Sequence, residues 1–167
     1  GRVLIRAMGW EGYHLSLFDC DDTCYTDRET FEQWQKDGME HVECYDDFTV
    51  GDILHRKGSK AIWEHDLGDS WRHTLRVVEN KPLAFSAHEV TLNKAKGACP
   101  PEDCGGVCGN ADLIDIMADP SHPEYEEYKE WLGHKLEPGR TNIAKARKAI
   151  KNYLNGGMAE YIRLPAK

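Results

Sequence analysis

The feature that most constrains this chain is a strand–turn–strand pattern over residues 61–78. Residues 70–78 alternate between apolar and polar side chains, which predicts a β-strand, and residues 61–65 are predicted as its partner strand. The segment 66–69 between them contains Asp and Gly, which tight turns favour. The apolar set of the second strand is Trp71, His73, Leu75 and Val77. Because this set faces the core, we expect His73 to point inward beside Trp71.

Helical and extended patterns flank this hairpin. We expect a helix over 3–8 that Gly9 ends, a strand over 13–18 and a short helix over 50–56 that Thr49 caps. Further helices are expected over 111–118, 123–132 and 142–154, and an edge strand over 161–164. Residues 19–47 are acidic and give no readable pattern. These elements predict an α+β fold, with a mostly antiparallel sheet whose central hairpin, about 61–78, packs against N-terminal and C-terminal helices.

The composition is that of a globular chain. Its 167 residues are 40% hydrophobic and 30% charged, which fits a single domain over 1–167. The net charge of -8 repels phosphate backbones, so nucleic-acid binding is not the expected function. A basic run, Lys145, Arg147, Lys148 and Lys151, is better explained as a solvated helix face than as a contact for nucleic acid.

The sequence also predicts where in the cell the protein is located. It contains no apolar run of the roughly 20 residues that a membrane-spanning helix needs. The chain begins with a helical pattern and not with a signal peptide, so we expect a cytoplasmic protein without a membrane partner. Six cysteines are then expected to be reduced thiols. The oligomeric state cannot be predicted from these features.

Three stretches together resemble the plasmid pRiA4b ORF-3-like family. Gly9-Trp10 followed by HLSLF at 14–18 resembles the family pattern GW…HLHxF, with Ser16 where a second His is usual. HDLGDSWRH at 65–73 resembles YDFGDSWxH, and CPPEDCGG at 99–106 resembles CPPEDxGG. The tail agrees at 119–122, 131–133 and 152–154.

The resemblance implies an α+β fold and a shared site or structural centre, but no reaction. Family members include passenger proteins of transposons, which implies an association with mobile elements. The strands that family members usually have before the first helix are absent from this sequence, so we expect a chain that is shortened at its N-terminus.

The turn of the second motif offers two carboxylates, Asp66 and Asp69. Such a pair can hold a divalent cation or act as acid and base. The alternative, which turn chemistry favours, is that these side chains cap the turn by accepting backbone N–H groups. His73 is likewise either a core histidine bonded to a backbone carbonyl or to Asp69, or a metal ligand or proton carrier.

The third motif lies in a loop expected over 97–110, with thiols at Cys99, Cys104 and Cys108. A zinc site of these three thiols completed by His73 is one interpretation, although the spacing is not that of paired CxxC motifs. The other is structural: a stiff Pro100-Pro101 segment followed by Glu102 and Asp103, which accept backbone N–H groups and lock the loop in place. Cys20, Cys24 and Cys44, with His14 or His41, are better explained as scattered cysteines than as a second metal site.

Three functional hypotheses follow. The first is a binding or interaction module with a polar pocket between the two motifs. Its predicted lining residues are His14, Asp66, Asp69, Trp71, His73, Glu102 and Asp103. If backbone bonds occupy all these side chains, they form only a structural lock. The second hypothesis is a metal-dependent hydrolase that uses Asp66, Asp69 and His73. The third is a nucleic-acid-associated accessory protein.

Overall fold

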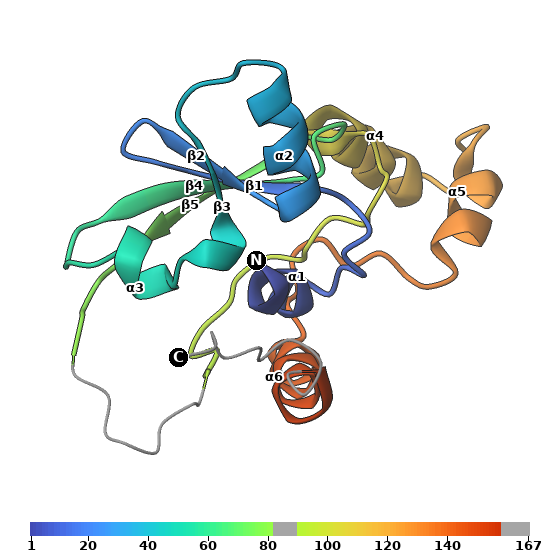
Figure 1. Ribbon diagram of the computed structural model, residues 1–167. Helices are drawn as coiled ribbons and strands as arrows, with labels where there is room; N and C mark the ends of the chain where they lie inside the picture. Colours follow the sequence, from blue (N-terminus) through green and yellow to red (C-terminus); the bar gives the residue numbers. More distant parts are fainter. Residues whose placement is uncertain (82–89, 158–167) are drawn as a thin grey trace. The chain divides into compact units, whose positions relative to one another are not determined.

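The computed structural model describes residues 1–81 and 90–157. Contacts divide the chain into two compact units, Gly1–Gly12 with His88–Lys167, and Tyr13–Ala87. The second contains every described strand and is called the strand unit here; the first is called the helical unit (Figure 1). The predicted edge strand at 161–164 lies outside the described residues. The single domain over 1–167 stays a prediction.

A five-stranded mixed sheet forms the centre of the strand unit. Its strands are β1 Ser16–Cys20, β2 Thr23–Thr26, β3 Val42–Cys44, β4 Lys60–His65 and β5 Trp71–Arg76, in the order β3-β2-β1-β4-β5. Only β2 and β3 pair in parallel among these strands. The predicted α+β class and the mostly antiparallel sheet are confirmed. The predicted hairpin is β4–β5, and it forms one end of this order and not its centre.

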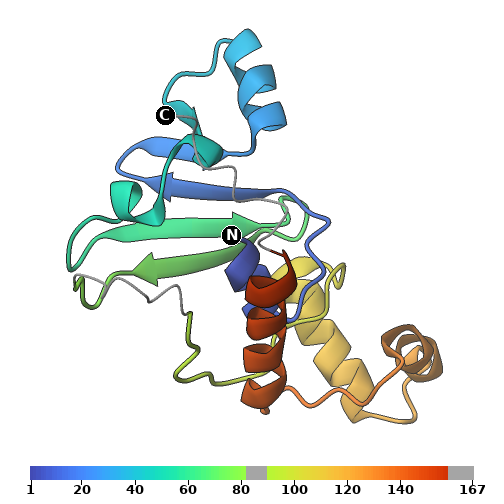
Figure 2. The same ribbon diagram turned by 60° about the horizontal axis from the view of Figure 1, so that its bottom comes forward.

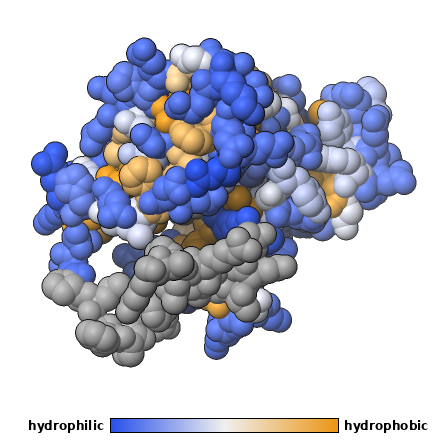
Figure 3. Space-filling view, in the orientation of Figure 1, coloured by the Kyte–Doolittle hydropathy of each residue, from blue (hydrophilic) through white to orange (hydrophobic). Residues whose placement is uncertain are grey.

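One face of the sheet carries a core of aromatic and imidazole rings. The register pairs Trp63 with His73 and His65 with Trp71 across β4 and β5. Trp63 and His65 are each 1% exposed. The alternation predicted for β5 is confirmed, because Trp71 is buried and His73 half-buried while Arg72 and Thr74 are exposed. Apolar residues also gather on the surface over the strands between α2 and α3 (Figure 3).

The segment 19–47, which gave no readable pattern, is ordered into strands and a helix. Asp21 and Asp22 both have positive φ, 48° and 63°, which forms the tight turn between β1 and β2. Asp27 caps α2, Arg28–Lys36, by accepting the Thr30 N–H at 3.0 Å. Helix α2 contacts β2 and β3, in which Thr26 and Cys44 are fully buried.

The predicted Thr49 cap is confirmed, but its helix is shorter than expected. Thr49 and Asp52 form a reciprocal capping box at the start of α3, Val50–Ile53. A 3-10 turn, Tyr45–Asp47, precedes it. The helix ends at Ile53 and not at residue 56, because Leu54 leaves the helical conformation at φ -111°, ψ 63°.

The helical unit contains α1 Arg2–Met8, α4 Gly106–Ala118, α5 Tyr125–Leu132 and α6 Ile143–Asn152. Gly9 ends α1 with φ 89°, as predicted. Helices α1 and α6 lie side by side (Figure 2), and a π-helical turn, Tyr153–Gly157, follows α6. Ala146 and Ile150 of α6 are buried, so they form the apolar stripe of this helix.

Helix α4 begins five residues before its predicted start. Gly105 stands at its N-cap with φ 85°, a conformation that favours glycine. Gly109 lies so close to the Cys104 carbonyl oxygen that a Cβ at this position would overlap it. Gly105 and Gly109 therefore allow the chain to enter the helix tightly. Cys108 consequently lies on α4 and not in a loop.

Candidate functional site

The turn between β4 and β5 is organised by Asp66. This residue has a positive φ of 59°, and its Oδ1 accepts the N–H groups of Gly68 at 3.0 Å and Asp69 at 3.3 Å. Its own N–H donates to the Leu15 carbonyl at 2.9 Å, and its carbonyl accepts from Ser70 N–H at 2.6 Å. Asp66 therefore caps the turn as the structural alternative predicts, and the same bonds fix the direction of its carboxylate.

The second oxygen of Asp66 lies next to a histidine. Oδ2 is 3.7 Å from His14 Nδ1, and the two side chains are 11% and 28% exposed. His14 immediately precedes the segment that leads into β1, and Asp66 directly follows β4, its antiparallel neighbour. The sheet register thus brings together two residues of the predicted pocket that are far apart in the sequence. An imidazole and a carboxylate at this distance can share a proton or a metal ion.

A buried hydrogen bond lies behind this pair. Ser16 Oγ and His65 Nδ1 are 2.8 Å apart, and both residues are buried. The His65 ring meets the His14 ring edge-on, with centroids 6.0 Å apart, and stacks on Trp63 at 5.5 Å. Ser16, Trp63 and His65 were not predicted as site residues. The alternation of Ala61, Trp63 and His65 along β4 was a signal that could have placed this histidine in the core.

The other residues predicted around the turn have structural contacts. His73 Nδ1 is 3.0 Å from the Trp71 carbonyl oxygen, and its ring packs against Trp63 at 4.9 Å. This is the backbone partner that the core interpretation of His73 predicts. Trp71 is 9% exposed, while Asp69 is half-buried and donates its backbone N–H to Asp66. Of the strand-unit candidates, His14 and Asp66 are therefore the two that the structure pairs.

The CPPEDCGG loop belongs to the helical unit and is tied to the end of α1. Glu102 accepts the Glu11 N–H at 2.8 Å with Oε2 and the Gly12 N–H at 3.3 Å with Oε1. Trp10 Nε1 donates to the Pro100 carbonyl at 2.9 Å. Glu102 thus accepts backbone N–H groups as the structural interpretation predicts, and both donors are residues that follow α1.

The three cysteines predicted as zinc ligands do not come together in the described part of the chain. Within residues 1–81 and 90–157, Cys99, Cys104 and Cys108 do not bring their sulfur atoms together as a group that could hold one ion. Burial, followed by the negative charges of Glu102 and Cys104, raises the pKa of Cys99 to about 12. A raised pKa disfavours the thiolate that zinc requires. His73 belongs to the other unit, so the predicted zinc site stays a prediction without geometric support.

The second set of cysteines is scattered as expected. Cys20, Cys24 and Cys44 form no such group with His14 or His41 among the described residues. Burial, followed by the charge of Asp19 and a hydrogen bond to it, raises the pKa of Cys24 to about 12. All six cysteines are free thiols.

The basic run on α6 is exposed but not wholly available to a ligand. Lys145, Lys148 and Lys151 are exposed on this helix. Arg147 donates to the carbonyl oxygens of Leu92 at 2.8 Å and Asn93 at 3.2 Å, so it holds the preceding loop. No helix in the described parts of the chain is both long enough and apolar enough to cross a bilayer.

Known proteins resemble this chain along most of its length. It is 30% identical over 150 residues to the uncharacterized protein y4hQ of Sinorhizobium fredii (strain NBRC 101917 / NGR234), covering 89% of this chain and 74% of the relative. The crystal structure of a protein of unknown function, MM3350 from Methanosarcina mazei Go1, has the same fold, with a TM-score of 0.68 at 23% identity over 86% of this chain and 78% of that one. The family model described as plasmid pRiA4b ORF-3-like protein matches residues 1–145. The predicted family is thus confirmed, and the chain belongs to the plasmid pRiA4b ORF-3-like family.

Proposed function

We propose that this protein is a binding module that takes a divalent transition-metal ion at His14 and Asp66 of the strand unit. The observation that carries the proposal is the 3.7 Å between His14 Nδ1 and Asp66 Oδ2. Ligand atoms that each lie about 2.0–2.2 Å from one metal ion are separated by about 3–4 Å. The pair therefore has the spacing of two ligands of a shared ion.

The local structure prepares Asp66 for this role. Two backbone N–H groups hold Oδ1, so the carboxylate cannot rotate freely and Oδ2 keeps its place beside His14. Holding a ligand in position before the ion arrives reduces the entropy that binding loses. The 11% exposure of the Asp66 side chain also strengthens its attraction for a cation, because little water screens it.

The donor types point to the class of ion. An imidazole nitrogen together with a carboxylate oxygen suits zinc, manganese, iron or cobalt better than calcium or magnesium, which prefer oxygen ligands alone. Water or a small ligand can complete the coordination. Asp103 of the helical unit was also predicted from the sequence motifs as a pocket residue; this stays a prediction, and an Asp103→Asn variant tests it separately.

The alternatives from the sequence gain less support. Hydrolysis by Asp66, Asp69 and His73 stays a prediction, because His73 lies against the Trp71 carbonyl and the Trp63 ring. A nucleic-acid-associated role linked to mobile elements also stays a prediction, which a strongly salt-dependent DNA affinity would support.

Calorimetric titration and thermal melting of chelator-treated protein test the proposal with Zn²⁺, Mn²⁺ and Mg²⁺ as probes. We expect Zn²⁺ or Mn²⁺ to stabilise the protein by about 2.7 kcal/mol at a hundredfold excess over Kd, and Mg²⁺ to stabilise it less. His14→Ala and Asp66→Asn should abolish the stabilisation. His55→Ala is the matched control, since His55 is an exposed histidine of the same unit.

Two results would overturn the proposal. One is wild-type protein that gains no thermal stability from any of these ions at millimolar concentration. The other is unchanged affinity in both His14→Ala and Asp66→Asn, which would show that the ion binds elsewhere. Far-UV circular dichroism of each variant verifies that the strand unit is folded.

A further inference from the structure

The negative charge of this chain is concentrated in one short part of the helical unit. Residues 112–137, which span most of α4 and all of α5, contain eight acidic and two basic side chains. Their formal net charge is -6, against -8 for the whole chain. A local field of this strength attracts cationic groups and repels anionic ones.

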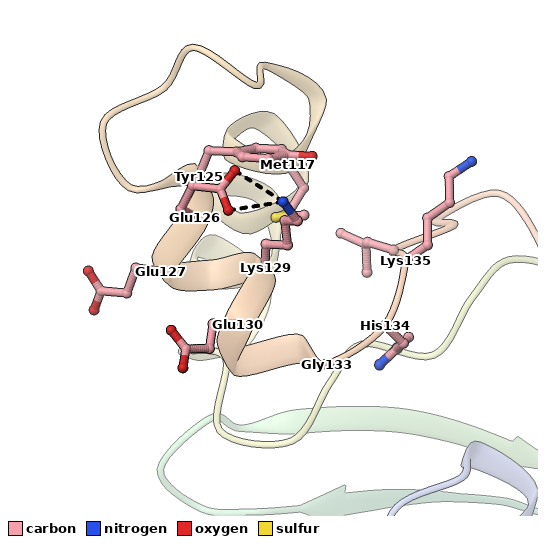
Figure 4. Close-up of a pocket in the computed structure, with 10 residues that line it drawn as sticks. Met117, Tyr125, Glu126, Glu127, Lys129, Glu130, Gly133, His134 and Lys135 are labelled. Carbon is pink, nitrogen blue, oxygen red and sulfur yellow. Dashed lines mark hydrogen bonds and ion pairs between the residues drawn. The ribbon is translucent and has the colours of Figure 1, made fainter.

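A groove of about 750 Å³ lies within the same region, between the end of α4, α5 and the segment 134–136 (Figure 4). Its apolar lining consists of Met117, Tyr125 and Leu136, all of which are half-buried. The α5 wall adds Glu126 and Glu130, and the other wall adds His134 and Lys135. The groove therefore combines an apolar surface with carboxylates on one side.

The wall of this groove already holds one ammonium group. Lys129 Nζ lies 2.9 Å from Glu126 Oε2 and 5.5 Å from the centroid of the Tyr125 ring. Figure 4 shows the Lys129 ammonium group beside the Glu126 carboxylate and next to Met117. Lys129 is thus held by a carboxylate three residues earlier on the same helix and lies near the ring of Tyr125.

We propose that this groove is a docking site for a lysine-bearing segment of a partner protein. Glu130 makes no hydrogen bond or ion pair with the described residues, so its carboxylate is available to a second ammonium group. Met117 and Leu136 provide apolar contact for the stem of the incoming lysine. This inference is independent of the metal site proposed for the strand unit, since no residue is shared.

Fluorescence anisotropy with a labelled, flexible peptide that carries several lysines tests the proposal on the full chain. We expect binding that weakens as salt rises, because surface ion pairs are screened. The double variant Glu126→Gln with Glu130→Gln should weaken binding by about fivefold, given two exposed ion pairs. Glu32→Gln on α2 is the matched control, since it removes an exposed carboxylate of the other unit and should leave affinity unchanged.

A charge-neutral variant separates docking in the groove from diffuse attraction. Leu136→Ser keeps every charge and removes apolar contact, so it should also weaken the peptide by severalfold. Equal affinity of Leu136→Ser and wild type, or equal loss in Glu32→Gln and the double variant, would overturn the groove as the site. Tight binding of spermidine without binding of the peptide would overturn the partner segment as its occupant. Thermal melting confirms that each variant is folded.

Discussion

Asp66 of the strand unit and Glu102 of the helical unit each accept two backbone N–H groups, but they use their oxygens differently. Asp66 accepts both with Oδ1, which leaves Oδ2 beside His14. Glu102 accepts one with each oxygen. The two acidic residues come from the two longest motifs that the chain shares with its family.

The number of oxygens that accept backbone N–H groups distinguishes a carboxylate that only stabilises the fold from one that can also bind a ligand. A carboxylate whose two oxygens both accept backbone N–H groups ties two chain segments together, and rotating toward a ligand would break those bonds. A carboxylate fixed through one oxygen presents the other in a defined direction. We therefore assign the candidate chemistry to the DLGDSWRH turn and a locking role to the CPPEDCGG loop.

The largest expected effect concerns the thiol of this loop. With its pKa raised from 9.0 to about 12, Cys99 should carry about a thousandfold less thiolate near neutral pH than an ordinary cysteine, and react correspondingly slowly with iodoacetamide. The exposed Cys108 should be labelled first, and Cys99 only after unfolding in urea. Peptide mapping by mass spectrometry measures both rates. Rapid labelling of Cys99 in folded protein would show that the loop opens and that Glu102 does not lock it.

The raised pKa of Cys99 also makes the stability of the folded protein depend on pH. The folded state opposes ionisation of Cys99, so the stability that its neutral form contributes is fully present below pH 9.0 and is lost as the pH rises toward about 12. A Cys99→Ala variant should show a smaller loss of stability over this range.

The second largest effect is a loss of stability expected when Asp66, which caps the β4–β5 turn, is replaced. Asp66→Ala should destabilise the protein by about 3 kcal/mol, because two N–H groups lose their acceptor and alanine disfavours the φ of 59°. Asp66→Asn keeps an oxygen acceptor and tolerates this conformation, so it should cost less than about 1 kcal/mol. Urea denaturation measures both. Equal losses would mean that the carboxylate oxygens do not organise the turn.

The sequence predicts such local features well and pairings between distant residues poorly. The β4–β5 turn could be predicted because Asp and Gly mark it, and Thr49 because it caps a helix. Helix α2 was missed because Phe31 and Trp34 are its only apolar residues, too few to make a readable helical pattern. The β1–β2 turn was missed because Asp21 and Asp22 replace the usual glycine.

In the candidate site, too, the individual residues could be predicted from the sequence but their pairing could not. His14 and Asp66 were both predicted as pocket residues, but only the register of β1 against β4 pairs them. The bond between Ser16 and His65 depends on that register too, and no local pattern encodes it. A one-residue slip would turn every side chain of the strand to the other face.

Ser16 and His65 provide the next prediction. Ser16→Ala should cost about 2 kcal/mol, because it removes the hydroxyl partner of a buried imidazole. The family patterns quoted above have His and Tyr at these two positions. The double variant Ser16→His with His65→Tyr should therefore recover part of the stability that the single variants lose, with a coupling of about 1 kcal/mol in a double-mutant cycle. Additive losses would show that the two positions are independent.

The smallest expected effect tests the locking role of Glu102. Glu102→Gln keeps one oxygen acceptor and loses the other, so we expect a loss of about 1 kcal/mol in urea denaturation. The affinity for Zn²⁺ or Mn²⁺ should stay that of the wild type, in contrast to the loss in Asp66→Asn. A Glu102→Gln protein of full stability but weakened metal affinity would reverse the assignment, because the carboxylate would then serve the ligand and not the fold. The two variants together therefore decide which motif carries the chemistry.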